Sequence, residues 1–165
     1  MTISVATREQ LVEVQKLAQI IWPATYGSIL SQDQFDYMME MMYSLPSLEK
    51  QLESGKVFLL VEEENRYVGF ASFELHVEAS NTTKIHKLYV LPETQGKGIG
   101  RKLIDYIKEI SINENDEILQ LTVNRHNKAK DFYLKYGFTI KEEKVFEIGN
   151  GYVMDDYVME IGISL

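Results

Sequence analysis

The sequence predicts a mixed α/β domain in which a central, twisted and largely antiparallel sheet of six to seven strands carries helices on both faces. Apolar residues follow helical spacing before residue 56, and apolar runs separated by short turns follow after it. A β-run, a glycine loop and an amphipathic helix stand in uninterrupted order at residues 88–104. At 165 residues, the chain has the length of a single domain, which we place at residues 1–165.

The first part of the chain is expected to form one strand and three helices. Residues 2–6 alternate as a strand, and Thr7 can cap a helix that follows helical spacing until Pro23 stops it. Ser31 opens a second helix, and residues 48–52 indicate a short third one. We expect these helices to lie over the sheet.

The remaining elements are mostly strands. Strands are expected at residues 57–61, 67–77, 84–91, 118–123, 138–148 and 152–161, and helices at residues 99–110 and 127–136. Glu64-Asn65 and Asn150-Gly151 are typical of tight turns, and residues 79–81 predict a bend. The near-continuous apolar run at residues 118–123 predicts a central strand that is covered on both faces.

Composition and charge exclude several classes of protein. No segment approaches the ~20 apolar residues of a membrane span, and no signal peptide is visible, so a membrane partner is not expected. The absence of cysteine removes disulfides and thiolate metal sites and fits a reducing cytoplasm; no metal is expected. The net charge of −8 repels nucleic acid and favours cationic partners, although most acidic residues serve solubility. The oligomeric state is left open, a homodimer included.

An anion site is expected where the β-run at residues 88–91 passes through a glycine loop into a helix. Gly96, Gly98 and Gly100 let the backbone approach a ligand without obstruction by a Cβ atom. The helix that starts near Ile99 points its unpaired N–H groups and positive dipole end into this loop, where a phosphate fits. The spacing excludes the Walker A loop, which needs Lys-Ser/Thr after its last glycine, and the dinucleotide loop, which needs a further glycine there.

Two motifs resemble those of the GNAT acetyltransferase superfamily. Gln95-x-x-Gly98-x-Gly100 is similar to the family's Q/R-x-x-G-x-G/A loop. The segment from Asn124 to Phe138 is similar to the family pattern N-x-x-N-x-x-A-x-x-x-Y-x-x-x-G-F. Their order and separation also match. The resemblance implies a GNAT-like fold and an acetyl-CoA-dependent N-acetyltransferase.

The resemblance also implies how acetyl-CoA is held. The backbone amides of the glycine loop would bind the pyrophosphate, and the main chain of residues 88–90 would pair with the pantetheine arm like an added strand. Two asparagines would bond the arm or the helix cap, and a purely capping role for Asn127 is left open. The expected cofactor residues are Leu88, Tyr89, Val90, Gln95, Gly96, Lys97, Gly98, Ile99, Gly100, Arg101, Asn124 and Asn127.

Tyr133 is the candidate general acid. It occupies the position at which the family motif places the tyrosine that meets the sulfur of CoA. A phenol with a pKa near ~10 is suited to protonate a thiolate leaving group. The alternative is that Tyr133 only fills the core with its helical neighbours.

Glu74 and His86 are the candidates for removing the proton from the amine. If the bend centres on Ser80, Glu74 lies opposite His86, and alternation places both on the face that also carries Leu88 and Val90. A carboxylate beside an imidazole should raise the imidazole's pKa, and the pair could relay a proton through water. Family members that use a carboxylate on this strand have it where this chain has His86. A partly solvated polar pair without a catalytic role is the alternative.

The acceptor is expected between two aromatic and acidic segments. Trp22 and Tyr26 are placed in a loop after the first helix, and the last hairpin adds Tyr152, Asp155 and Asp156. These segments resemble bacterial acetyltransferases of the spermidine/spermine type, and their side chains suit a polyamine or similar small cationic amine. Two alternatives are left open: a protein or peptide N-terminal amine as acceptor, and a non-catalytic acyl-CoA-binding module.

Overall fold

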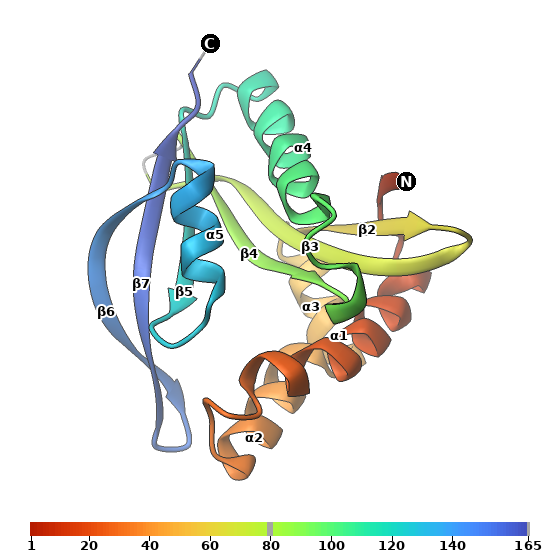
Figure 1. Cartoon of the computed structure of the whole chain (residues 1–165), viewed down its shortest axis with the longest axis vertical. Helices are drawn as coiled ribbons and strands as arrows, with labels where there is room; N and C mark the ends of the chain where they lie inside the picture. The colour runs from red at the N-terminus through yellow and green to blue at the C-terminus, as the bar shows by residue number, and fades with distance from the viewer. Residues whose placement is uncertain (79–80, 165) are drawn as a thin grey trace.

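A computed structural model describes residues 1–78 and 81–164 of the chain. Its strands form one sheet in the order β1-β2-β3-β4-β5-β7-β6 (Figure 1), and all neighbours are antiparallel except β4 and β5. The strands are β1 (Thr2–Val5), β2 (Val57–Glu63), β3 (Arg66–Val77), β4 (Thr82–Val90), β5 (Ile118–Asn124), β6 (Thr139–Gly149) and β7 (Tyr152–Gly162). The helices are α1 (Leu11–Tyr26), α2 (Gln32–Tyr43), α3 (Leu45–Glu53), α4 (Ile99–Asn113) and α5 (Ala129–Tyr136), with 3-10 turns at Arg8–Gln10 and Pro92–Thr94. The predicted α/β class is confirmed.

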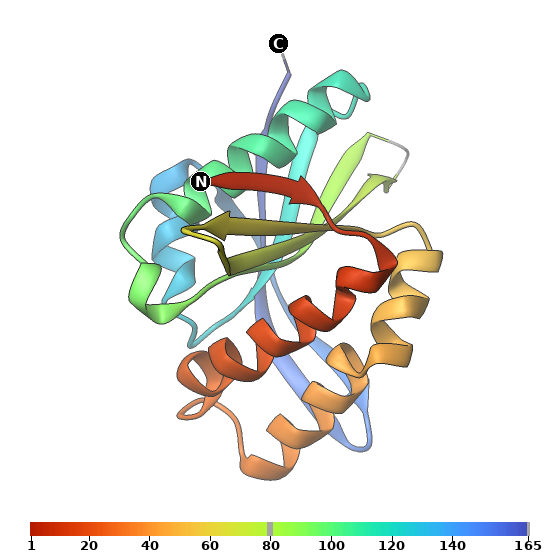
Figure 2. The ribbon, with the colours of Figure 1, turned by 90° about the vertical axis from the view of Figure 1, so that its right-hand side faces the viewer.

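The helices lie on both faces of the sheet, α1 to α3 on one and α4 and α5 on the other (Figures 1 and 2). On the α1–α3 face, the ring of Tyr43 lies 6.0 Å from that of Phe70 on β3 and 5.3 Å from that of Trp22. On the opposite face, α4 buries one apolar side of its surface, with Leu103 and Ile107 fully covered. The core therefore occupies both sides of the central strands.

The prediction that Pro23 ends the first helix is wrong. α1 continues to Tyr26, and the N–H of Gly27 still bonds to the carbonyl of Pro23 at 3.0 Å. Proline removes only one donor from a helix, and here it does so on an exposed side close to the helix end, where water can satisfy the carbonyl one turn earlier. Residues 22–26 are consequently helical and do not form the predicted loop.

The strand order confirms the central position predicted for β5, which lies between β4 and β7. Both predicted tight turns are present, with positive φ at Glu64, Asn65, Asn150 and Gly151. The predicted bend at residues 79–81 falls largely outside the described residues. In the part of the chain that the structure describes, no helix is long and apolar enough to cross a membrane.

Candidate active site

The strands β4 and β5 pair over only part of their length. Their parallel register joins residues 82–85 to residues 118–121, and the last paired residues are Ile85 and Leu121. Beyond this point both strands continue, and Figure 1 shows them separating toward α1 and α2. We call the unpaired stretch, residues 86–90 of β4 and 122–124 of β5, the β4–β5 divergence. Along it, the edge of β4 that faces β5 has no strand partner, and the carbonyl of Val90 accepts a bond from Gln95 Nε2 at 3.4 Å.

The predicted glycine loop lies between the end of β4 and the start of α4. Gly96 and Gly98 have φ of 83° and 80°, and a Cβ atom at either would meet no atom within 4 Å. Gly98 is the N-cap of α4, so the first N–H groups of that helix have no partner within it. The loop thus has the open space and the unpaired N–H groups that an anion site needs, and anion binding there stays a prediction.

Gly100 has a different reason to be glycine. A Cβ atom there would lie 3.1 Å from the ring of Phe132 on α5. Gly100 thus permits α4 and α5 to approach each other. The neighbouring basic residues Lys97, Arg101 and Lys102 are exposed, and the guanidinium of Arg101 lies over the ring of Tyr136 at 5.1 Å.

The two predicted asparagines follow the last residues of β5. Asn124 is buried, and its Oδ1 accepts a bond from the N–H of His126 at 2.9 Å. Asn127 lies one residue before the N-cap of α5, Lys128, and its Oδ1 accepts from the N–H of Ala129, the first residue of the helix, at 2.9 Å. The Nδ2 group of Asn127 lies 3.4 Å from the hydroxyl of Tyr26.

Tyr133 lies on α5, 7% exposed, with its ring against those of Phe132 and Phe138. Its hydroxyl makes no hydrogen bond to any described residue, and it is not one of the fully enclosed atoms without a partner, so the oxygen keeps some access to solvent. Burial raises the pKa of the phenol well above its usual value, and the nearby Tyr26 adds to the effect. The phenol therefore holds its proton at neutral pH, as a general acid must.

Tyr26 and Trp22 both lie in α1 and not in the loop that was predicted to line the acceptor site. Tyr26 is buried at the end of α1, and its hydroxyl lies 3.0 Å from that of Tyr89 on β4. Burial raises the pKa of both phenols. Trp22 is only 1% exposed, and its Nε1 donates to the hydroxyl of Tyr43 at 3.1 Å. Trp22 is a core residue that cannot line an acceptor site.

Glu74 and His86 touch, although the predicted register is wrong. Glu74 pairs with Lys84, because a shift in register between residues 72 and 73 of β3 leaves His86 as the extra residue on β4. The side chains still meet, with Glu74 Oε1 3.0 Å from His86 Nε2 and 4.0 Å from Lys56 Nζ. The register also pairs Leu88 with Ala71, one position from Ser72, so Leu88 and Val90 lie on the opposite face from Glu74.

The predicted rise in the pKa of His86 is also wrong. Burial lowers it to about 4; the hydrogen bond to the Glu74 carboxylate opposes this effect, and the charges of three neighbouring lysines add to it. His86 is therefore neutral at pH 7. The sequence could not show this, because burial and the lysines act together only in the folded chain.

The last hairpin separates the three residues predicted to bind the acceptor. The ring of Tyr152 packs against that of Tyr37 on α2, 5.4 Å apart. Asp155 forms an ion pair with Arg125, at 3.1 Å between Oδ2 and Nε. Asp156 points to the other face and is 8% exposed. The two carboxylates face opposite sides of the sheet, because adjacent residues of a strand alternate between its faces.

Nothing in the sequence pointed to two residues near the last hairpin, Gln34 and Met154. Gln34 on α2 donates through Nε2 to the carbonyl of Val153 at 2.9 Å and lies 3.7 Å from the sulfur of Met154. These contacts join α2 to the hairpin. Neither residue belongs to a motif, so only the fold brings them to the site.

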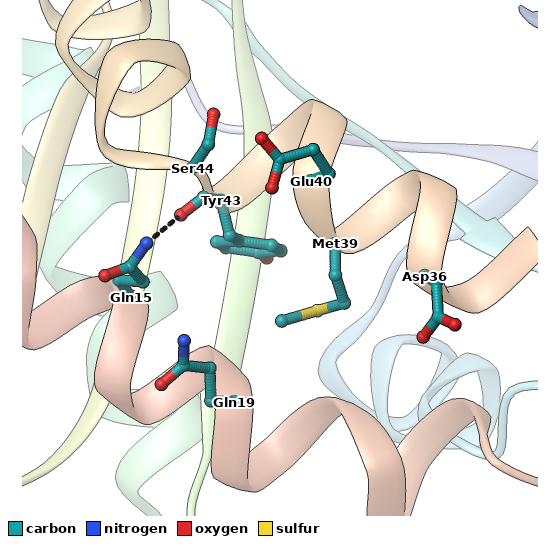
Figure 3. A pocket seen from close by; sticks show the side chains of 7 residues that line it. All are labelled: Gln15, Gln19, Asp36, Met39, Glu40, Tyr43 and Ser44. Atoms are coloured by element: carbon teal, nitrogen blue, oxygen red, sulfur yellow. Dashed lines mark hydrogen bonds between the residues drawn. The ribbon is translucent and has the colours of Figure 1, made fainter.

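A separate cavity of about 170 Å³ lies between α1 and α2 (Figure 3). Its lining residues are Gln15, Gln19, Asp36, Met39, Glu40, Tyr43 and Ser44. None of them belongs to the β4–β5 divergence, the glycine loop or α5. This cavity is therefore distinct from the candidate active site.

Comparison with known sequences identifies the family of this chain. Residues 28–160 match the acetyltransferase (GNAT) domain family. The chain is 34% identical over 80 residues to an uncharacterized N-acetyltransferase of Archaeoglobus fulgidus, covering 46% of this chain and 54% of that protein. It is 24% identical over 159 residues to the spermidine N(1)-acetyltransferase of Thermoplasma acidophilum, covering 93% and 92%. The chain spans about half the length of three curated relatives, at 54%, 43% and 44%.

Solved structures show the same fold. The crystal structure of the PaiA N-acetyltransferase of Thermoplasma acidophilum, in complex with coenzyme A, has a TM-score of 0.79 to this chain. The two are 24% identical, and the match covers 98% of this chain and 99% of that one. With the family match over most of its length, the chain belongs to the GNAT acetyltransferase family, whose members named here are N-acetyltransferases.

Proposed function

We propose that this protein transfers an acetyl group from acetyl-CoA to a primary amine, and that the amine is a polyamine or a similar small cation. The observation that carries the proposal is the β4–β5 divergence, where residues 88–90 pair with β3 on one edge and have no strand partner on the edge that faces β5. Membership of the GNAT family and the coenzyme A bound to a structural relative support the choice of cofactor. The absence of cysteine supports a cytoplasmic location.

Acetyl-CoA would lie along the divergence. The free N–H groups at the start of α4 and the amides of residues 95–98 would bind its pyrophosphate, where Gly96 and Gly98 leave open space. Lys97 and Arg101 are close enough in sequence to meet the phosphates. The pantetheine arm would pair with residues 88–90, which lie at the edge of β4, and Asn124 and Asn127 would close the far side.

The chemistry needs one proton removed and one supplied. The amine nitrogen attacks the thioester carbon, a C–N bond forms, and the C–S bond breaks to release a thiolate. Tyr133 would donate its proton to this thiolate, since its hydroxyl has no hydrogen-bond partner among the described residues and its raised pKa keeps it protonated. Glu74 and neutral His86 would pass the proton of the ammonium to water.

Several features support a cationic acceptor. The net charge is −8, the hydroxyl of Tyr26 contacts that of Tyr89 in the divergence, and Asp156 pairs with Asn124 at its other side. A relative that matches nearly the full length is named a spermidine N(1)-acetyltransferase. Trp22 is left out of this proposal because it is buried.

Thiol release from acetyl-CoA, screened over polyamines, aminoglycosides, amino acids and peptides, tests the proposal. We expect the highest kcat/KM with polyamines. Good turnover of a peptide N-terminus with none of any polyamine would replace the acceptor and keep acetyl transfer. Tight binding of acetyl-CoA without thiol release on any amine would instead favour the non-catalytic acyl-CoA-binding module.

A further inference from the structure

Asp156 is a buried carboxylate that the fold leaves without a partner. The residue is 8% exposed, and its Oδ1 makes no hydrogen bond to residues 1–78 or 81–164. Buried charged groups in proteins are as a rule paired, because an unpaired one loses its hydration without compensation. An unpaired carboxylate at such a position points to a ligand that supplies the missing partner.

The side chain of Asp156 lies on the face of the sheet that α1 and α2 cover. Met154, two residues earlier on β7, has its sulfur 3.7 Å from Gln34 on α2, and alternate residues of a strand share a face. The neighbouring Asp155 points the other way, where Arg125 holds it. Only one of the two carboxylates is therefore free to meet an acceptor.

Strand register places Asp156 level with the expected reaction centre. Ile85 and Leu121 are the last paired residues of β4 and β5, and because His86 is an extra residue in β4, Tyr89 and Asn124 lie three regular positions further along the two strands. Asn124 pairs directly with Asp156 on β7. Asp156 thus stands one strand beyond the divergence, at the height where residues 88–90 would hold the thioester.

The charges around Asp156 leave it available to a cation at neutral pH. Burial raises its pKa to about 6, with Asp155 adding to the rise and Lys84 on β4 opposing it. Lys144, the cross-strand neighbour on β6, lies over the ring of Phe146 at 5.1 Å. From α1, the phenol of Tyr26 faces the carboxylate and is uncharged, since its own pKa is raised.

We propose that Asp156 binds a second ammonium group of the acceptor and so selects amines by the distance between two nitrogens. The inference rests on the proposed acetyl transfer to a small cationic amine. A pantetheine arm paired to β4 like an added strand would lie about two strand spacings, or ~10 Å, from β7, and the hydrogen bond between an ammonium group and the Asp156 carboxylate covers about 3 Å of this, which leaves ~7 Å. A saturated chain of four or five bonds spans about 5–6 Å between its end nitrogens. The favoured acceptors are therefore amines with a second charge three or four carbons away, as in spermidine.

A series of linear diamines with two to eight carbons, compared with n-butylamine, tests this selection. For the wild type we expect kcat/KM to peak at three or four carbons. Asp156→Asn should lower kcat/KM for these diamines about 10- to 100-fold, the range of a hydrogen bond to a charged group, and remove the peak. It should leave n-butylamine and the affinity for CoA nearly unchanged. Asp155→Asn, the matched control, should keep the peak because its carboxylate is held by Arg125 on the other face.

Asp156→Glu distinguishes selection from a structural role. Its carboxylate reaches about one methylene further, so the peak should move to a diamine one carbon shorter, which no loss of stability would produce. A peak unchanged by Asp156→Asn or by Asp156→Glu overturns the inference and leaves the proposed acetyl transfer standing. A wild type that acetylates peptides and no diamine overturns both the inference and the proposed acceptor.

Discussion

The substitution Tyr133→Phe separates a catalytic hydroxyl from a structural one. The ring of Tyr133 is buried between Phe132 and Phe138, but its hydroxyl bonds to no described residue. Phenylalanine keeps the ring packing and removes a group that has no protein partner, so the free energy of unfolding should change by less than ~0.5 kcal/mol. The affinity for CoA should also stay the same.

Turnover should fall far more than stability. General acid catalysis typically contributes 10²–10⁴-fold, so kcat should drop about 10²-fold or more, which is ~2.7 kcal/mol in the activation barrier. Steady-state thiol release at saturating acetyl-CoA and polyamine measures kcat, and thermal unfolding and calorimetry measure the two quantities expected to stay constant.

Tyr136→Phe is the matched control because it should lower the stability and leave kcat unchanged, the opposite of what is expected for Tyr133→Phe. The hydroxyl of Tyr136 donates to Asp105 Oδ1 at 2.6 Å on the surface of α5. Its removal should cost about 1 kcal/mol of stability and leave kcat within about threefold. If Tyr133→Phe also kept kcat within threefold, the thiolate would take its proton from water and Tyr133 would be a packing residue.

Three further substitutions test the cofactor site, the proton relay and a distant anchor of the fold. Gly98→Val should weaken CoA binding in calorimetry by about tenfold or more relative to Gly98→Ala, because both variants share the strain of φ 80° and only valine adds bulk over the loop; equal affinities would refute this placement of the pyrophosphate. Glu74→Gln should lower kcat/KM more at pH 6 than at pH 9, since fewer amines arrive neutral at low pH, and a loss independent of pH would remove the relay through His86. Asp116→Asn should destabilise the fold by about 1–3 kcal/mol at pH 7, because the buried carboxylate accepts bonds from His76 and Thr83 that an amide only partly replaces. Burial alone would raise the pKa of Asp116, but these bonds and the charge of His76 lower it. The stabilisation by the carboxylate is therefore present above pH ~4 and is lost as the pH falls through the lowered pKa. A difference in Tm between the wild type and Asp116→Asn that did not shrink at such pH would contradict the assignment.

Local patterns in the sequence were enough to predict most of the fold. Helical spacing, turn residues and the glycine loop predicted every strand of the sheet and the start of α4, because these features depend on neighbours within a few residues. Pro23 misled the prediction for the opposite reason. Its effect on α1 depends on how near the helix end is and on which side meets water, and both are set by the tertiary structure.

The site residues could be predicted only where a motif or a short hairpin links them. The loop around Gly98 and the contact between Glu74 and His86 are local in this sense, and the contact survived an error of register because a bulge brought the side chains together. The burial of Trp22 and the ion pair that removes Asp155 involve residues from distant parts of the chain. No spacing in the sequence reports such contacts.

A crystal structure of this protein with bound CoA tests the central claim most directly. We predict that the pyrophosphate lies over residues 95–100 and that the sulfur lies within ~3.5 Å of the hydroxyl of Tyr133, with the pantetheine arm paired to residues 88–90. Such a complex would join the glycine loop, the β4–β5 divergence and the proposed acid in one site. CoA bound elsewhere, for example in the cavity between α1 and α2, or a sulfur far from Tyr133, would contradict the account.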